Sequence, residues 1–217
     1  TWVGLSGRVR VVAYNTDKLT EADLPSDIRG FTDPKWKGRI GWAPSNASLH
    51  AMITAMRSAW GDDETRRWIE GIVANEPHAY DKNGPVVEAV AKGEVDVGFV
   101  NHYYLYNYLA EQGDGFKARN AVLKDGGPAS ILLVSGIGIL KTAAHPEAAL
   151  RFVQFLLDHE AQAYFAERTW EYPLSSGVKP DPKLPDLTGL KLTPFDLSTL
   201  GDVQSTVAML RDAGALP

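Results

Sequence analysis

Two adjacent tyrosines follow an apolar run that ends at Asn101, and their phenol groups are the side chains best suited to chemistry in this chain. Tyr103 and Tyr104 come directly after VDVGFVN (95–101), which has the composition of a buried strand. Successive residues of a helix point about 100° apart, so packing into one core does not require both rings. A metal ion approached from the strand-to-helix junction can use both phenol oxygens.

Phenol oxygens favour a hard, highly charged cation. The pKa of a phenol is about 10, so at neutral pH only a strongly polarising ion displaces its proton. Ferric iron does so, whereas zinc and copper prefer imidazole or thiolate ligands. Core packing is the other interpretation of tyrosines in this stretch, and we favour it for Tyr106 and Tyr108.

Polar residues also precede two further expected helices. Ser45 to Ser48 lead into a helix expected over 47–61, and Lys82 and Asn83 lead into one expected over 84–94. Free backbone N–H groups at helix starts bind anions, so adjoining junctions would form an anion site. The same residue types serve as helix caps and turn residues, and the residues alone leave both interpretations open.

Strands and helices alternate along the chain, which predicts an α/β fold with a mostly parallel sheet. In the helix that starts at His145–Pro146–Glu147, Phe152, Phe155 and Leu156 are expected to face inward. The tract 173–194 is rich in Pro, Lys and Asp, which predicts a long surface connection. A last helix is expected over 199–212.

Composition limits the function classes. The net charge of −5 argues against a nucleic-acid partner, and the absence of cysteine excludes thiolate metal sites and cysteine nucleophiles. The longest apolar stretch, 131–140, is too short to span a bilayer. Neither a glycine-rich phosphate fingerprint nor a nucleophile elbow is present. An α/β hydrolase or transferase using Asp81 and Glu94 is an alternative, but no two acids stand together at strand ends, so we expect no enzyme.

Four stretches together resemble the periplasmic ferric-iron-binding proteins of ABC transporters, which are bacterial transferrin-like proteins with the type II periplasmic-binding-protein fold. These are WVGLSGRVRVVAYN, RIGWAPSNAS, YDKNGPVVEAVAKGEVDVGFVNHYYLY and YPLSSGV. The resemblance covers nearly the whole chain, and Asn-His-Tyr-Tyr is its most specific part. It implies that Tyr103 and Tyr104 ligate Fe3+.

The resemblance also implies a site for a synergistic anion, phosphate or carbonate. The anion-binding residues that it implies are Asn46, Ala47, Ser48, Asn83 and Asn101. Arg8 falls where some members carry an anion-binding arginine, although we expect a surface role for it near the hinge. The sequence departs from the family at Ala47, where some members supply a third tyrosine.

Domain organisation and partners follow from the same resemblance. It implies that residues 1–133 and 185–217 form most of the C-terminal lobe, that 134–184 belong to the N-terminal lobe, and that roughly a hundred residues preceding Thr1 are absent. It further implies iron uptake through a membrane permease, in the periplasm or, with a lipid anchor, on a Gram-positive cell surface. An uncovered face would then favour self-association. The alternative within transport is uptake of an organic or phosphorus-containing anion, of the phosphonate, thiamine or polyamine type.

Overall fold

The computed structural model describes residues 2–193 and 201–217, and the chain divides into two compact units. The smaller unit consists of residues 1–8 and 133–189, and the larger unit of residues 9–132 and 190–217. The division expected from the sequence placed residues 1–8 with those that follow them. They group with the smaller unit instead, because Ser6 and Gly7 pair with Tyr172 and Pro173.

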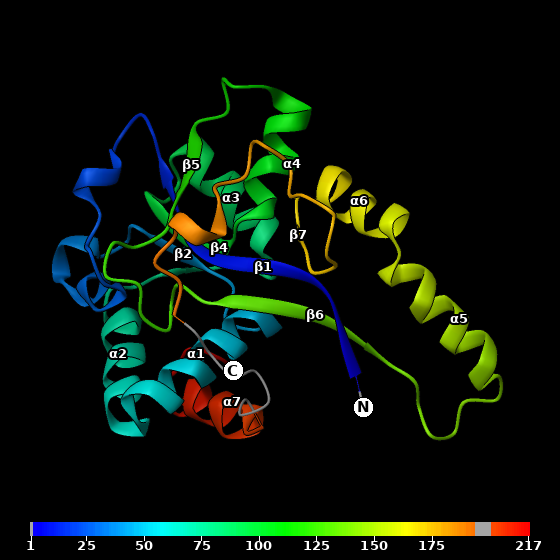
Figure 1. Cartoon of the computed structure of the whole chain (residues 1–217). Coiled ribbons are helices and arrows are strands. Elements are labelled where there is room, and N and C mark those ends of the chain that lie inside the picture. Colours follow the sequence, from blue (N-terminus) through cyan, green and yellow to red (C-terminus); the bar gives the residue numbers. More distant parts are fainter. Residues whose placement is uncertain (1, 194–200) are drawn as a thin grey trace. The chain divides into compact units, whose positions relative to one another are not determined.

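The larger unit is built on a sheet with the strand order β3-β2-β4-β1-β5 (Figure 1). Its strands are β1 (Trp2–Asn15), which starts in the smaller unit, β2 (Ile40–Trp42), β3 (His78–Ala79), β4 (Val97–Asn101) and β5 (Ala118–Ala121). Strand β2 is parallel to β3 and β4, whereas β1 is antiparallel to β4 and β5. The α/β class is confirmed, but the sheet is mixed rather than mostly parallel.

Five α-helices belong to the larger unit among its described residues. They are α1 (Ala47–Trp60), α2 (Asp62–Ala74), α3 (Asn83–Lys92), α4 (Tyr103–Gln112) and α7 (Val203–Asp212). Short 3-10 helices lie at Glu21–Asp23, Ile28–Thr32 and Pro34–Trp36. The helix expected over 199–212 begins at Val203, and its first two expected residues lie outside the described part of the chain.

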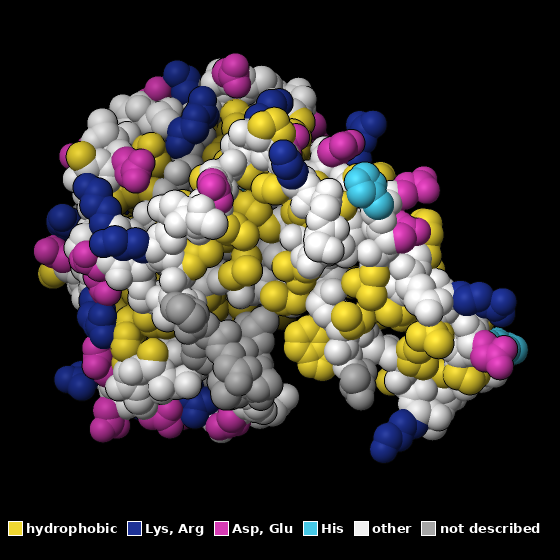
Figure 2. All heavy atoms as spheres, in the orientation of Figure 1, with side chains coloured by type: hydrophobic (Ala, Val, Ile, Leu, Met, Phe, Trp, Pro, Cys, Tyr) yellow, Lys and Arg dark blue, Asp and Glu magenta, His cyan; other side chains and the backbone are white. Residues whose placement is uncertain are grey.

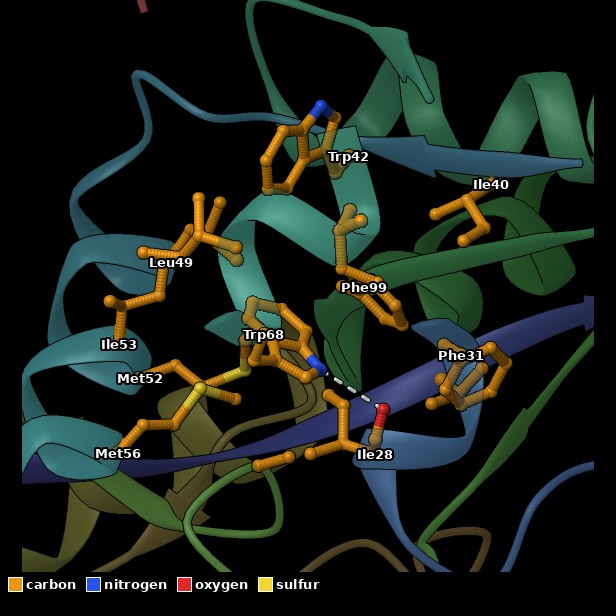
Figure 3. Close-up of a cluster of buried hydrophobic side chains, with 14 of the residues drawn as sticks. Ile28, Phe31, Ile40, Trp42, Leu49, Met52, Ile53, Met56, Trp68 and Phe99 are labelled. Carbon is orange, nitrogen blue, oxygen red and sulfur yellow. Dashed lines mark hydrogen bonds between the residues drawn. The ribbon is translucent and has the colours of Figure 1, made fainter. Parts of the chain in front are cut away.

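The core of the larger unit lies where α1 and α2 pack on the sheet (Figure 3). Leu49, Ile53 and Met56 are buried on one face of α1, as their spacing of three and four predicts. Trp68 of α2 is buried too, and its Nε1–H donates a hydrogen bond of 3.1 Å to the Ile28 carbonyl oxygen. This packing fixes the helix whose first residues border the candidate site.

The smaller unit pairs the beginning of β1 with β7 (Tyr172–Pro173), and also contains β6 (Leu132–Gly138), α5 (Pro146–Leu157), α6 (His159–Arg168) and the 3-10 helix Leu187–Gly189. The side-chain amide of Gln162 ties these elements together. Its Nε2 donates to the carbonyl oxygens of Leu5 (2.8 Å) and Leu156 (2.9 Å), and its Oε1 accepts from the Leu174 N–H at 3.0 Å. Because the whole amide is hydrogen-bonded, Gln162 is fully buried at low cost.

Helix α5 leaves its large apolar side chains exposed. Leu150, Phe152 and Phe155 are 50%, 56% and 49% exposed, and Figure 2 shows apolar side chains at the surface of this part of the chain. The expectation that Phe152 and Phe155 face inward is therefore wrong. Their spacing places them on one face of the helix, but no other described part of the chain covers that face.

Among the described residues, no helix is long and apolar enough to cross a membrane.

A buried carboxylate joins three segments of the larger unit. Asp96, which is 7% exposed, accepts from Lys18 Nζ at 2.7 Å and from Arg39 Nε at 2.5 Å. Burial alone would raise the pKa of this carboxyl, but the two hydrogen bonds and positive charges outweigh it and hold the pKa below its usual value. The carboxylate therefore stabilises the fold above the unfolded-state pKa of about 3.9, and loses this contribution as the pH falls through the folded-state pKa.

We expect Asp96→Asn to lower the free energy of unfolding by about 2 kcal/mol at pH 7, because two charge-assisted hydrogen bonds are lost inside the protein. Urea unfolding measures the change, which should shrink when the pH is lowered below the folded-state pKa of Asp96. Asp17→Asn is the control, since Asp17 is exposed and forms an ion pair with Lys117 at the surface. Equal effects of the two variants would contradict the structural role of Asp96.

Candidate metal and anion site

Three helix starts meet at one edge of the sheet in the larger unit. Strands β2, β3 and β4 are parallel, so their carboxyl ends lie at the same edge, and α1, α3 and α4 begin directly after them. Each helix start carries backbone N–H groups without intrahelical acceptors and the positive end of a helix dipole. The expected convergence of the three strand-to-helix junctions is therefore found in the structure.

Ser48 connects the polar side chains of these junctions. Its Oγ accepts from Arg10 Nη1 at 3.2 Å and from Asn83 Nδ2 at 3.1 Å, and it donates to Asn46 Oδ1 at 2.6 Å. Residues from β1, α1 and α3 thus meet around one hydroxyl. Three of the five residues expected to bind an anion, Asn46, Ser48 and Asn83, belong to this network.

The other two expected anion ligands have different positions. Asn101, at the end of β4, is buried and its Oδ1 accepts from Arg10 Nη1 at 3.1 Å. Ala47 is the first residue of α1 and is exposed, so only its backbone N–H suits an anion. Asn46 caps α1 by accepting from the Ser48 N–H at 3.0 Å, which means that its oxygen serves the helix and only its amino group remains for a ligand.

Arg10 is the residue that sequence reasoning missed. It lies opposite Asn101 in the antiparallel pairing of β1 and β4, and its side chain is fully buried. Its Nε and Nη2 have no hydrogen-bond partner among the described residues. Burial lowers the pKa of this guanidinium to about 9, while the nearby phenol groups of Tyr103 and Tyr104 act in the opposite direction. Arg10 is therefore a buried cation with two unsatisfied donor atoms.

Arg8, the arginine that falls at the family's anion-binding position in the sequence, makes a different interaction. Its Nε lies 3.5 Å from Glu171 Oε2 within the smaller unit, so its charge already has a counter-charge. Arg8 and Arg10 are two residues apart on β1 and share one face of the strand. The sequence pattern alone could not separate them.

Tyr103 and Tyr104 begin α4 side by side. Their rings stack with centroids 4.3 Å apart and planes inclined by 29°, and both side chains are half-buried. Phenols that pack only as core residues do not need a partly exposed position at a helix start. Both tyrosines lie close enough to Arg10 to interact electrostatically with its guanidinium.

His102 and Asn120 fix the start of α4. The His102 ring is buried, and its Nδ1 accepts a hydrogen bond of 3.1 Å from the Val9 N–H. Asn120 Nδ2 donates to the His102 carbonyl oxygen at 2.8 Å. The imidazole therefore faces the backbone of β1 through Nδ1, and its ring packs edge-to-face against the Tyr103 ring with centroids 5.9 Å apart.

The arrangement suits a cation and an anion bound together. Two phenol oxygens can carry negative charge toward a cation, and a buried guanidinium with three helix starts offers donors to an anion. Among the described residues no three histidine, aspartate or glutamate side chains gather in a way that could hold a metal.

Comparison with protein families gives one match that spans most of the chain. The model of the family "Bacterial extracellular solute-binding protein" matches residues 1–196. Among curated relatives, the major ferric iron-binding protein of Neisseria meningitidis serogroup A is 31% identical over 215 residues, covering 98% of this chain and 64% of the relative. Iron uptake protein A2 of Synechocystis is 36% identical over 221 residues, covering 96% of this chain and 63% of the relative.

Solved structures of iron-binding proteins are also similar to this chain. Iron-bound HitA from Pseudomonas aeruginosa has a TM-score of 0.93 and 32% identity, covering 98% of this chain and 69% of that protein. A Trichodesmium protein in complex with iron and citrate has a TM-score of 0.85 and 27% identity, covering 98% of this chain and 70% of that one. The chain thus spans a little under two thirds of the length of the curated relatives that it matches first.

Proposed function

Because the chain belongs to the family of bacterial extracellular solute-binding proteins, we propose that it captures ferric iron together with a small oxyanion. The observation that carries this proposal is the stacked pair Tyr103 and Tyr104 beside the buried charge of Arg10. The family is one of binding proteins, so a hydrolase or transferase site at Asp81 and Glu94 is not proposed.

Phenol chemistry supports iron as the cation. Each tyrosine that binds as phenolate contributes one hard oxygen and one negative charge, and ferric iron is the common biological cation that polarises phenol strongly enough at neutral pH. Arg10 is positive and so is the metal, so the two repel each other unless an anion lies between them. A bound oxyanion would satisfy the Arg10 donors and fill a coordination position on the iron.

Phosphate and carbonate are the anions that we propose for this position. Both are small, and both can use the Arg10 donors, the Ala47 N–H at the start of α1 and the amide of Asn83. The Trichodesmium protein in complex with iron and citrate supports an oxyanion of some kind as a second ligand. Asn46, Ala47, Ser48, Asn83 and Asn101 remain our proposed anion-binding residues, with Arg10 added to them.

Titration of the chain with ferric iron tests the proposal. Phenolate bound to ferric iron absorbs visible light by charge transfer, so a coloured complex should form in the presence of phosphate or hydrogen carbonate. The colour should weaken when both anions are withheld. A colourless mixture with all of the added iron left free would contradict the proposal.

Capture of a phosphorus-containing organic anion without metal is the second candidate. The buried, partly unsatisfied guanidinium of Arg10 favours it, because such a group binds a phosphonate as well as an inorganic anion. A putative 2-aminoethylphosphonate-binding periplasmic protein of Salmonella typhi is 27% identical over 177 residues, covering 77% of this chain. Binding of a phosphonate that is unaffected by removal of iron, with no colour on iron addition, would favour this candidate.

The cellular role that we propose is delivery of iron to the membrane permease of an ABC transporter. The Fe(3+)-binding periplasmic protein of Serratia marcescens, a relative of this chain, supports a periplasmic location. A lipid-anchored position on the cell surface is the equivalent in Gram-positive bacteria. We also propose that the larger unit corresponds to the C-terminal lobe of the fold and that residues 133–189 belong to the N-terminal lobe.

We expect this chain to self-associate in solution through the exposed face of α5. Phe152 and Phe155 stack with ring centroids 6.4 Å apart and are about half exposed, and contiguous exposed apolar groups favour association. Sedimentation at increasing protein concentration should show dimers or larger species. The double variant Phe152→Ser, Phe155→Ser should shift the chain to monomer, whereas Arg151→Ser on the same helix should not. A monomeric unmodified chain would contradict this expectation.

A further inference from the structure

We propose that His102 is a positioning residue for the tyrosine pair, because its imidazole takes the place of its own backbone carbonyl in the pairing of β1 with β4. This exchange lets the chain leave β4 and begin α4 at Tyr103. The inference rests on the proposed function, in which Tyr103 and Tyr104 are iron ligands. It assigns the side chain that sets where their phenol oxygens lie.

The pairing of β1 with β4 reaches one residue beyond the pair formed by Arg10 and Asn101. The next position sets Val9 opposite His102, and the His102 N–H donates to the Val9 carbonyl oxygen at 3.0 Å. Two residues in such an antiparallel pair normally exchange both hydrogen bonds, so the Val9 N–H is expected to donate to the His102 carbonyl oxygen. It donates to His102 Nδ1 instead, at 3.1 Å.

The His102 carbonyl is turned away because this residue already has helical backbone angles, with φ −58° and ψ −39°. In a helix the carbonyl points along the helix axis rather than across to a neighbouring strand. The His102 carbonyl oxygen accepts from Asn120 Nδ2 of β5 at 2.8 Å. Both backbone groups that leave the strand pairing, the Val9 N–H and the His102 carbonyl, therefore have side-chain partners.

The hydrogen bond from Val9 also fixes the tautomer of His102. A backbone N–H can only donate, so Nδ1 must accept, and the proton of the neutral ring lies on Nε2. Val9 and His102 are 1% and 3% exposed, so water has little access to this hydrogen bond. Without the imidazole, the Val9 N–H would be a buried donor with no acceptor, which is unfavourable.

A side chain without an acceptor at position 102 leaves the chain two arrangements. Either the Val9 N–H stays unpaired, or residue 102 becomes extended and offers its carbonyl oxygen, which lengthens β4 by one residue. The second arrangement delays the start of α4. Since successive helix residues point about 100° apart, the phenol oxygens of Tyr103 and Tyr104 would leave their present positions.

Hydrogen exchange and nitrogen NMR of the metal-free 217-residue chain at neutral pH test the hydrogen bond itself. We expect the His102 ring to carry its proton on Nε2 and the Val9 amide to exchange slowly. His102→Asn, whose Oδ1 can accept in place of Nδ1, should keep the slow exchange, whereas His102→Leu should lose it. A proton on Nδ1 in the unmodified chain would overturn the inference.

Titration of the same variants with ferric iron tests the positioning role. His102→Leu should weaken ferric binding at least about tenfold and displace the charge-transfer band, while His102→Asn should stay within about threefold of the unmodified chain. His78→Leu makes the same exchange at an exposed position of β3 and should change neither property.

Equal losses in the asparagine and leucine variants, or unchanged ferric binding in His102→Leu, would overturn the inference. A colourless unmodified chain would contradict the proposed function instead. In that case the Val9 amide, which is measured without metal, still decides whether the imidazole holds this junction.

Discussion

Replacing either Tyr103 or Tyr104 by phenylalanine should weaken ferric binding on the order of a hundredfold and abolish or displace the visible charge-transfer band. Each change removes one of the oxygen ligands that we propose and one negative charge, while the ring that packs against its neighbour remains. The melting temperature should change little, because the half-buried rings lose only their hydroxyl groups. Absorbance titration with a competing chelator measures the affinity.

Tyr106→Phe is the matched control, since it makes the same chemical change on the same helix at a position that we assign to packing. Its ferric affinity should equal that of the unmodified chain. If the Tyr103 and Tyr104 variants instead have a lower melting temperature and retain their ferric affinity, these two tyrosines are core residues.

Arg10→Met should remove anion binding, and with it the gain in thermal stability that an oxyanion gives the unmodified chain. The methionine fills much of the arginine volume but carries no donor, so the anion loses the charged fork formed by Nε and Nη2. We expect the anion affinity to fall by at least about tenfold, and the iron complex to lose its dependence on added phosphate. Thermal unfolding with and without phosphate, together with calorimetry, measures both effects.

The pKa of Arg10 determines whether a bound anion raises or lowers the stability of the folded chain. Burial lowers the pKa of Arg10 in the folded chain to about 9. Between pH 9 and the usual pKa of arginine, the unfolded chain therefore binds one more proton than the folded chain, and the free energy of unfolding rises with pH. Below pH 9 the guanidinium is charged in both states, and the cost of burying that charge is fully present. A bound anion offsets this cost at neutral pH. Arg8→Met is the control, because Arg8 pairs with Glu171. An equal loss of anion affinity in both variants would contradict the role of Arg10.

The sequence was sufficient to place most of the candidate site. Strand-to-helix alternation predicts that polar junctions share one sheet edge, and the tyrosine pair stands out by its residue type. Arg10 could not be found in this way, because its position depends on the register that sets it opposite Asn101 across β1 and β4. Register between strands about ninety residues apart is not encoded in any local pattern.

Helix α5 illustrates a second limit. Periodicity correctly predicts that apolar side chains gather on one face of the helix, because helical spacing fixes which residues are neighbours. It does not tell whether another element covers that face. Phe152 and Phe155 have the pattern of core residues and the exposure of surface residues.

The four hydrogen bonds at Gln162 have a consequence for how the smaller unit opens. One amide links the beginning of β1, the end of α5 and the segment after β7, so separating any of these elements leaves buried polar atoms unpaired. Partial opening is therefore penalised, and the elements should exchange their amide protons with solvent as one cooperative unit rather than fraying singly. The hydrogen bonds of this one glutamine thus define the smallest cooperative unfolding unit of the smaller unit.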